Sequence, residues 1–362
     1  MFGMMVSQGN VDQVEGTAAA FAQVAEKSYV LGIQTDDLIR DQAPLKSFIE
    51  KRRSETWGGV FLWDKQCDDA WQSTWPPSLP RLFYTGKDIF SYGGAFNRLL
   101  VLALVAKAPV LVRVDAGTAP LSPALFSASL KSHLALLDKY AVVSGGYSGR
   151  IALRDLKGVE GPSERSKFHE LVKRRIAVDP LRQLTGGACF ALRPESGPPA
   201  IAFPGVLPVW ASDDAFFQWV APSFYVNAPD PDKGKGQPKD PMIVQRNDPG
   251  QPLTGPEYLA RLACAAALTD IHQKANLSLR DIPILDTVVD AGKAFLDDLR
   301  ESFPDAVRAS HHGGALHRLH ERALGLIEGY ENYIELKARW GDVRDQIATI
   351  AARSLPFNIC HG

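Results

Sequence analysis

Short apolar runs separated by amphipathic stretches dominate the first part of the chain. The apolar runs predict strands at residues 29–34, 59–63, 81–84, 110–114 and 140–144. Between them, a period of 3.6 residues predicts helices at 44–54, 96–107 and 122–139, after a polar lead and a helix within residues 1–27. Strands that alternate with helices indicate an α/β fold, with a mostly parallel sheet flanked by helices.

The pattern changes further along the chain. Residues 66–80 combine tryptophans with prolines, which predicts a loop or a short irregular helix. Residues 184–192 predict a strand with two glycines near its start. Residues 227–251 are rich in Pro, Gly, Asp and Lys and predict either a linker or a lid. Helical periodicity then continues over 256–278, 284–302 and 314–352. We therefore expect a catalytic domain at 1–250 and a C-terminal α-helical region at 251–362.

Composition excludes several classes of protein. The chain has 362 residues and a net charge of −1, which argues against a nucleic-acid partner. No run approaches the roughly 20 apolar residues of a membrane span, and the first residues lack the pattern of a signal peptide. The four cysteines are widely spaced, which favours reduced thiols. These features predict a cytoplasmic protein without a transmembrane segment.

One acid stands out at the end of an apolar strand. Residues 95–120 predict a helix, a tight turn and a buried strand that ends at Asp115. Ligands of open α/β sheets collect at the carboxyl ends of strands, where an aspartate can hold a divalent cation against a phosphate. The alternative is an ordinary turn acid, because Asx turns are common at strand ends.

Other polar motifs follow predicted elements in a fixed order. Asp36-Asp37 and Asp64 follow the first two strands, and Asn97-Arg98 precede the strand of Asp115; Gly186-Gly187 and Asp213-Asp214 come later. This order resembles that of the GT-A glycosyltransferases, in the inverting family-2-like branch. The resemblance implies a GT-A-like fold and transfer of a sugar from a nucleotide-diphosphate donor to a hydroxyl acceptor.

The resemblance also implies roles for these residues. The donor site would comprise Asp36, Asp37, Asp64, Asn97, Arg98, Gly186, Gly187 and Arg246. Asp214 would be the general base that takes the acceptor proton, with Asp213 as the neighbouring choice. The alternative for this pair is two acids that favour a helix N-terminus. The acceptor would be a small molecule or a glycan, and the long C-terminal helix could form a homodimer.

The metal signature departs from the family pattern. Gly117 stands where the family usually has a second acid, so Asp115 would hold Mn²⁺ or Mg²⁺ alone or with a histidine such as His312. The donor is expected to be a UDP-sugar rather than a GDP-sugar. It also stays open whether Gly117 removes the dependence on metal altogether.

Two other functions remain open at this stage. A nucleotidyltransferase of related fold would share the sheet and the metal aspartate, and a catalytically silent nucleotide-binding or scaffold protein would need neither. Motifs of kinases, dinucleotide dehydrogenases and α/β-hydrolases are absent from the sequence. The basic stretch 158–182 is interpreted as a solvated helix face in preference to a mobile element above a diphosphate.

Overall fold

The computed structural model describes the chain in segments. They are residues 1–5, 11–24, 29–34, 47, 57–84, 92–120, 122–144, 147–148, 158–159, 161–176, 189–197, 199–202, 223–225, 243–245, 263, 266–267, 285–309, 312–354 and 360–361. Within these segments, no helix has the length and apolar character that a membrane crossing needs.

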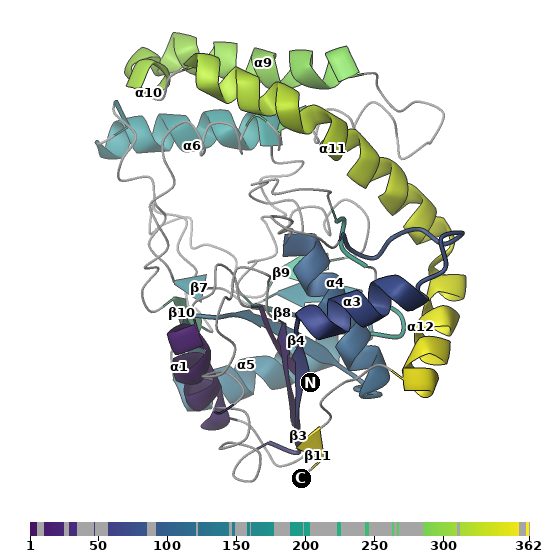
Figure 1. Ribbon diagram of the computed structural model, residues 1–362. Coiled ribbons are helices and arrows are strands. Elements are labelled where there is room, and N and C mark those ends of the chain that lie inside the picture. The colour runs from purple at the N-terminus through teal and green to yellow at the C-terminus, as the bar shows by residue number, and fades with distance from the viewer. Residues whose placement is uncertain are drawn as a thin grey trace.

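The larger of the two described sheets lies in the lower half of the view in Figure 1. Its eight strands lie in the order β11-β3-β2-β1-β4-β8-β6-β9 among the described residues. Their bounds are β1 (Phe2–Met5), β2 (Val30–Gln34), β3 (Gly59–Trp63), β4 (Leu111–Asp115), β6 (Val142–Ser144), β8 (Cys189–Leu192), β9 (Ser223–Tyr225) and β11 (Cys360–His361). β1 to β4 are parallel, whereas β8 runs antiparallel to both β4 and β6. The sheet is therefore mixed, with a parallel half that contains the N-terminal strands.

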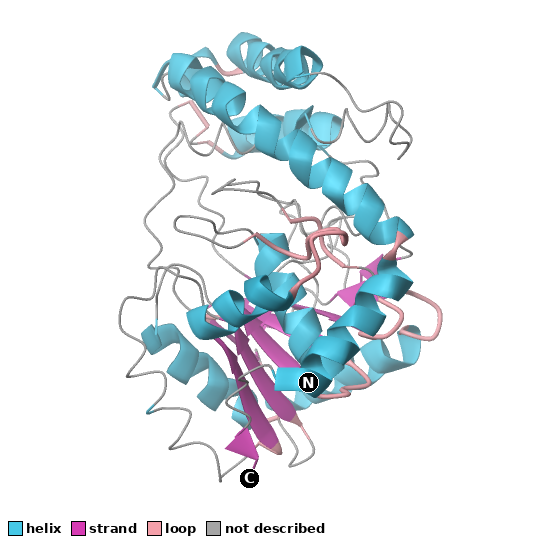
Figure 2. Ribbon diagram, turned by 45° about the vertical axis from the view of Figure 1, so that its right-hand side comes forward, coloured by secondary structure: helices cyan, strands magenta, loops and turns pink. Residues whose placement is uncertain are grey.

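Helices cover both faces of this sheet, as Figures 1 and 2 show. α1 (Val11–Ala22) and α5 (Pro123–Leu136) share one core with the even-numbered side chains of β1 and β4. α4 (Tyr92–Val105) covers the other face, together with α3 (Lys65–Thr74) and α12 (Trp340–Ser354). Because successive side chains of a strand point to opposite faces, strands covered on both sides are apolar throughout.

The second sheet has three short strands. It contains β5 (Thr118–Pro120), β7 (Tyr147–Ser148) and β10 (Ile243–Gln245), in the order β5-β10-β7. β5 follows β4 after a two-residue turn, so the small sheet begins where β4 of the large sheet ends. β10 is a strand inside the stretch that the sequence predicts as linker or lid.

Four helices form a group above the large sheet in Figure 1. They are α6 (Pro162–Ile176), α9 (Leu285–Ser302), α10 (Pro304–Ala309) and the first part of α11 (His312–Ala338). Phe168 of α6 packs against Phe303, with ring centroids 5.5 Å apart. α11 then descends to α12, whose Val343 and Ile347 are buried in the core beside α4.

The end of the chain returns to the sheet. β11 pairs antiparallel with β3, with Cys360 opposite Val60. In the described part of the C-terminal region, helices α9 to α12 are thus followed by an edge strand of the sheet, and α12 supplies part of the core. The boundary predicted at residue 250 lies outside the described residues.

Two predicted elements are wrong. The lead is not polar throughout, because Phe2–Met5 form β1 in the middle of the sheet. Residues 81–84 form no strand, and their apolar side chains are buried in a loop. Between the predicted loop and short irregular helix at 66–80, the structure has a regular helix, α3, which Asp64 caps, followed by a loop to residue 80. The helices predicted at 44–54 and 256–278 lie largely outside the described residues.

Candidate active site at the carboxyl edge of the sheet

The parallel half of the sheet has a topological switch point. The chain passes from β1 outward to β2 and β3, and then returns to the other side of β1 as β4. In open α/β sheets, ligands bind outside the carboxyl ends of the strands at such a point. Four residues lie in register at this edge: Trp63, Gln34, Met5 and Asp115.

Asp115 is the acid at the switch point. Its side chain is 29% exposed, and its carboxylate Oδ1 lies 2.6 Å from a guanidinium nitrogen of Arg113, whose own side chain is only 2% exposed. The backbone carbonyl of Asp115 accepts a hydrogen bond of 2.6 Å from the Thr118 hydroxyl. A charged, partly exposed carboxylate is thus held at the edge of the sheet by contacts within its own strand and turn.

The turn after Asp115 explains why no second acid follows. Gly117 has a φ of +87°, a region that residues with a Cβ rarely adopt. Its N–H donates a hydrogen bond of 2.8 Å to the hydroxyl of Thr17 on α1. An aspartate at this position would be strained, so the turn favours glycine over the second carboxylate of the family pattern.

The residues at this edge supply few ligands for a divalent cation. Mg²⁺ is often held by one or two carboxylates together with substrate phosphates, and Asp115 supplies one such carboxylate. In the described segments, no group of three or more His, Cys, Asp and Glu side chains comes together. The residues therefore fit a cation that a bound diphosphate shares, and do not form a complete metal site of their own.

His312 is the other residue predicted for the metal. It begins α11, directly after α10, in the helical group that Figure 1 draws above the sheet, whereas Asp115 ends β4 within the sheet. The metal pairing of His312 with Asp115 stays a prediction.

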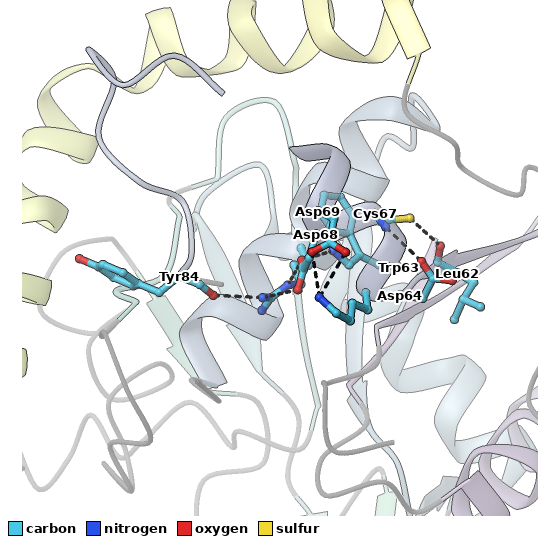
Figure 3. A network of polar contacts seen from close by, with 9 residues as sticks. Leu62, Trp63, Asp64, Cys67, Asp68, Asp69 and Tyr84 are labelled. Atoms are coloured by element: carbon cyan, nitrogen blue, oxygen red, sulfur yellow. Dashed lines mark hydrogen bonds and ion pairs between the residues drawn. The ribbon is translucent and has the colours of Figure 1, made fainter. Parts of the chain in front are cut away.

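Asp64 caps a helix. It is 5% exposed, and its carboxylate accepts a hydrogen bond of 3.1 Å from the backbone N–H of Cys67, which satisfies the first turn of α3 (Figure 3). Burial raises the pKa of the neighbouring Cys67 thiol to about 12, so this thiol stays protonated. The donor role predicted for Asp64 would have to be added to this capping role.

Arg98 belongs to a buried network that Figure 3 shows from close by. Its Nε and one terminal nitrogen donate to the two carboxylate oxygens of Asp68, at 2.8 and 2.9 Å. Asp68 also accepts a hydrogen bond of 2.6 Å from the indole N–H of Trp63, and Arg98 donates to the carbonyl of Tyr84 at 3.2 Å. The guanidinium lies 4.4 Å from the ring centre of Phe83. A buried bidentate pair of this kind fixes α3, α4 and the loop at residues 81–84 relative to one another.

Asn97 joins three segments. Its amide nitrogen donates to the carbonyls of Leu82 and Ala200, at 2.6 and 2.8 Å, and its amide oxygen accepts from the N–H of Ala200 at 2.8 Å. The side chain is fully buried. Gly93 makes the approach possible, because a Cβ there would lie 1.7 Å from the carbonyl oxygen of Ile201. The motif predicted to bind the donor therefore also has a structural function.

The C-terminal helices hold the loop that leads to α4. The Asn332 side chain forms two hydrogen bonds of 2.7 Å with the backbone of Arg81, one as acceptor and one as donor. Arg339 donates to the carbonyl of Ser78 at 2.7 Å. Burial, with Glu328 nearby, raises the pKa of Tyr84 well above its usual range. Contacts of α11 and of Arg339, which lies between α11 and α12, thus position one border of the candidate site.

The remaining predicted site residues lie outside the described part of the chain. They are Asp36, Asp37, Gly186, Gly187, Asp213, Asp214 and Arg246. Their roles stay predictions.

A separate groove of about 430 Å³ lies between α6 and α9 and contains no predicted site residue. Its lining includes Arg174, Asp298 and Glu301, and the described charged side chains of α6 are exposed, in agreement with a solvated face.

Sequence reasoning missed Arg113, Asp68 and Gln34, which are all buried near the carboxyl edge. Arg113 had a signal, since an arginine interrupts the apolar strand Leu111–Asp115. No sequence signal marks Asp68 and Gln34 as buried, because nothing in their local sequence distinguishes them from exposed polar residues.

Two glycosyltransferases, both of low identity, are among the solved structures that match this chain. The mannosyltransferase PcManGT from Pyrobaculum calidifontis, in complex with GDP-Man and Mn²⁺, is 14% identical to this chain; the match covers 94% of this chain and 87% of that one, with a TM-score of 0.40. Mouse xyloside xylosyltransferase 1, in its apo form, is 12% identical; the match covers 54% of this chain and 67% of that one, with a TM-score of 0.28. No family model and no curated protein matches the chain.

Proposed function

We propose that this protein is a glycosyltransferase that moves a sugar from a nucleoside diphosphate to a hydroxyl acceptor, with inversion at the anomeric carbon. The observation that carries the proposal is the position of Asp115, a partly exposed acid at the carboxyl end of β4, beside β1, where the strand order reverses. The order of motifs in the sequence adds the donor and acceptor residues.

In this proposal, the acceptor oxygen bonds to the anomeric carbon as the bond to the diphosphate oxygen breaks. Asp214 takes the acceptor proton as general base, with Asp213 as the neighbouring choice. Asp115 would hold a divalent cation, which as a Lewis acid stabilises the charge of the departing diphosphate. Arg98 has a structural role in this proposal. Its guanidinium pairs with Asp68 and so holds α4 against α3. Asp36, Asp37, Gly186, Gly187 and Arg246 would complete the donor site.

A screen of nucleotide sugars by thermal shift tests this class. We expect UDP- or GDP-sugars, in the presence of Mn²⁺ or Mg²⁺, to raise the melting temperature, and turnover to release UDP or GDP. The preference for uracil stays a prediction, so both series belong in the screen. Release of pyrophosphate would favour a nucleotidyltransferase instead. A scaffold protein would give neither a product nor a nucleotide-induced shift.

The assignment of the base has its own test. Asp214→Asn is expected to reduce transfer by at least 100-fold and to leave donor affinity nearly unchanged, because the base acts on the acceptor. Asp213→Asn is the matched control in the neighbouring residue. Retained transfer in Asp214→Asn would show that Asp214 is not the base, and loss confined to Asp213→Asn would exchange the two roles.

A further inference from the structure

A buried arginine lies beneath the acid of the candidate site. Arg113 is 2% exposed in β4, which lies between β1 and β8. Residues 111, 113 and 115 point to the same face of the sheet because side chains alternate along a strand. A guanidinium buried among apolar residues is costly unless it is paired, and it cannot lose its proton. Arg113 forms an ion pair with Asp115, 2.6 Å away.

The two members of this pair differ in their access to solvent. Asp115 is 29% exposed, whereas Arg113 is hidden beneath it. A ligand at the carboxyl edge therefore meets the carboxylate with a positive charge directly behind it. The net charge of the pair is zero, and the fixed guanidinium repels a metal cation that approaches Asp115.

We propose that Arg113 is a positioning residue, which fixes the carboxylate of Asp115 and cancels its charge, so that this acid does not bind a free divalent cation. The negative charges of a nucleoside diphosphate restore the attraction, and cation and diphosphate are bound together. This inference rests on the proposed function for the identity of the anion. The pairing itself rests only on Arg113 and Asp115.

Replacing the arginine is a better test than replacing the acid. In Arg113→Met the buried positive charge is removed, whereas the remaining Asp115 side chain is 29% exposed. Asp115→Ala would instead leave a buried guanidinium without this partner, which destabilises the fold and obscures any effect on binding. Arg113→Lys keeps the positive charge and serves as the conservative variant.

The experiment titrates the full-length protein with Mn²⁺ alone and follows free Mn²⁺ by electron paramagnetic resonance. We expect weak binding to the wild type and to Arg113→Lys, and at least tenfold tighter binding to Arg113→Met. Arg193→Met removes an exposed arginine, which pairs with the exposed Asp138, and is expected to bind Mn²⁺ as weakly as the wild type. A fluorescence melting curve of each variant checks that it is folded.

A second arm repeats the titration with UDP or GDP present. We expect wild-type affinity for Mn²⁺ to rise at least tenfold, and the gain to be smaller in Arg113→Met, which already binds the ion. Equal binding of Mn²⁺ alone by the wild type and Arg113→Met would overturn the inference. If neither nucleotide binds in any variant, the proposed function fails, while the titrations with Mn²⁺ alone still decide the role of Arg113.

Discussion

Polar residues that the sequence predicts as donor ligands also form hydrogen bonds within the protein. Asn97 and Arg98 stand in the sequence as candidate donor ligands, yet hydrogen bonds to the protein engage the amide atoms of Asn97 and both members of the Arg98–Asp68 pair. Position along the chain could not reveal this, because the partners come from Leu82, Ala200 and Asp68. A polar motif before a strand can therefore bind a ligand or hold parts of the protein together, and only its contacts show which of the two it does.

Asn97 gives the first prediction. Asn97→Ala removes three buried hydrogen bonds and leaves the Leu82 and Ala200 backbone groups without them, so we expect a loss of about 3 kcal/mol of unfolding free energy. Urea unfolding measures it. Asn332→Ala also removes side-chain hydrogen bonds to backbone, but at an exposed position, and should cost about 1 kcal/mol or less. Equal losses in the two variants would contradict the bridging role of Asn97.

Gly117 gives a second prediction at the same scale. Gly117→Ala places a Cβ at a φ of +87° and should cost about 1–2 kcal/mol. Gly16→Ala is the matched control, because Gly16 lies within α1 with nothing near its Cβ position, and it should gain about 0.5–1 kcal/mol. Thermal unfolding of both variants checks the difference. A neutral Gly117→Ala would mean that the turn does not select against a second acid.

At the scale of elements, helices outside the sheet build the border of the candidate site. α3 and α4 are joined by the Arg98–Asp68 pair. Asn332 of α11 and Arg339, between α11 and α12, hold the loop at 78–84. The sequence predicted the α4 helix and the β4 strand because their patterns are long or strongly apolar. It missed β1, since four residues are too few to show a period, and it left α3 open between a loop and a short irregular helix, because the apolar positions of α3 are few.

The pair between α3 and α4 gives the third prediction. Asp68→Ala leaves the buried Arg98 guanidinium without its carboxylate, and we expect a loss of about 3–5 kcal/mol. Asp69→Ala, in the next position of the same helix, removes an exposed pair with Lys65 and should cost about 0.5 kcal/mol or less. Chemical denaturation compares the two. Similar losses would show that the Arg98 pair does not stabilise the junction.

At the scale of the whole molecule, the C-terminal region is part of the core. Leu336, Val343, Ile347 and Ile350 pack with α4, and β11 extends the sheet beside β3. Described parts of residues 251–362 therefore pack against α4 and extend the sheet, and the boundary at residue 250 stays a prediction. We expect one cooperative unfolding transition that includes both the sheet and α12.

Ile347 tests this integration. Ile347→Ala should cost about 2–4 kcal/mol because it leaves a cavity between α12 and α4. Leu324→Ala on α11 is the control, since Leu324 is 63% exposed and its truncation should change stability by about 0.5 kcal/mol or less. Calorimetry should show the whole transition moving to lower temperature in Ile347→Ala. A separate early transition would mean that α12 unfolds independently of the sheet.

The sequence by itself determined the alternation of strands and helices, the strand that ends at Asp115 and the glycine that follows it, because periodicity, apolar runs and glycine preferences are local properties of a chain. The tertiary structure alone decided that Asp115 lies at a switch point, that Arg113 pairs with it, and that Asn97 and Arg98 bind other parts of the protein. These facts depend on which strands become neighbours and on how side chains pack, and neither follows from spacing along the chain.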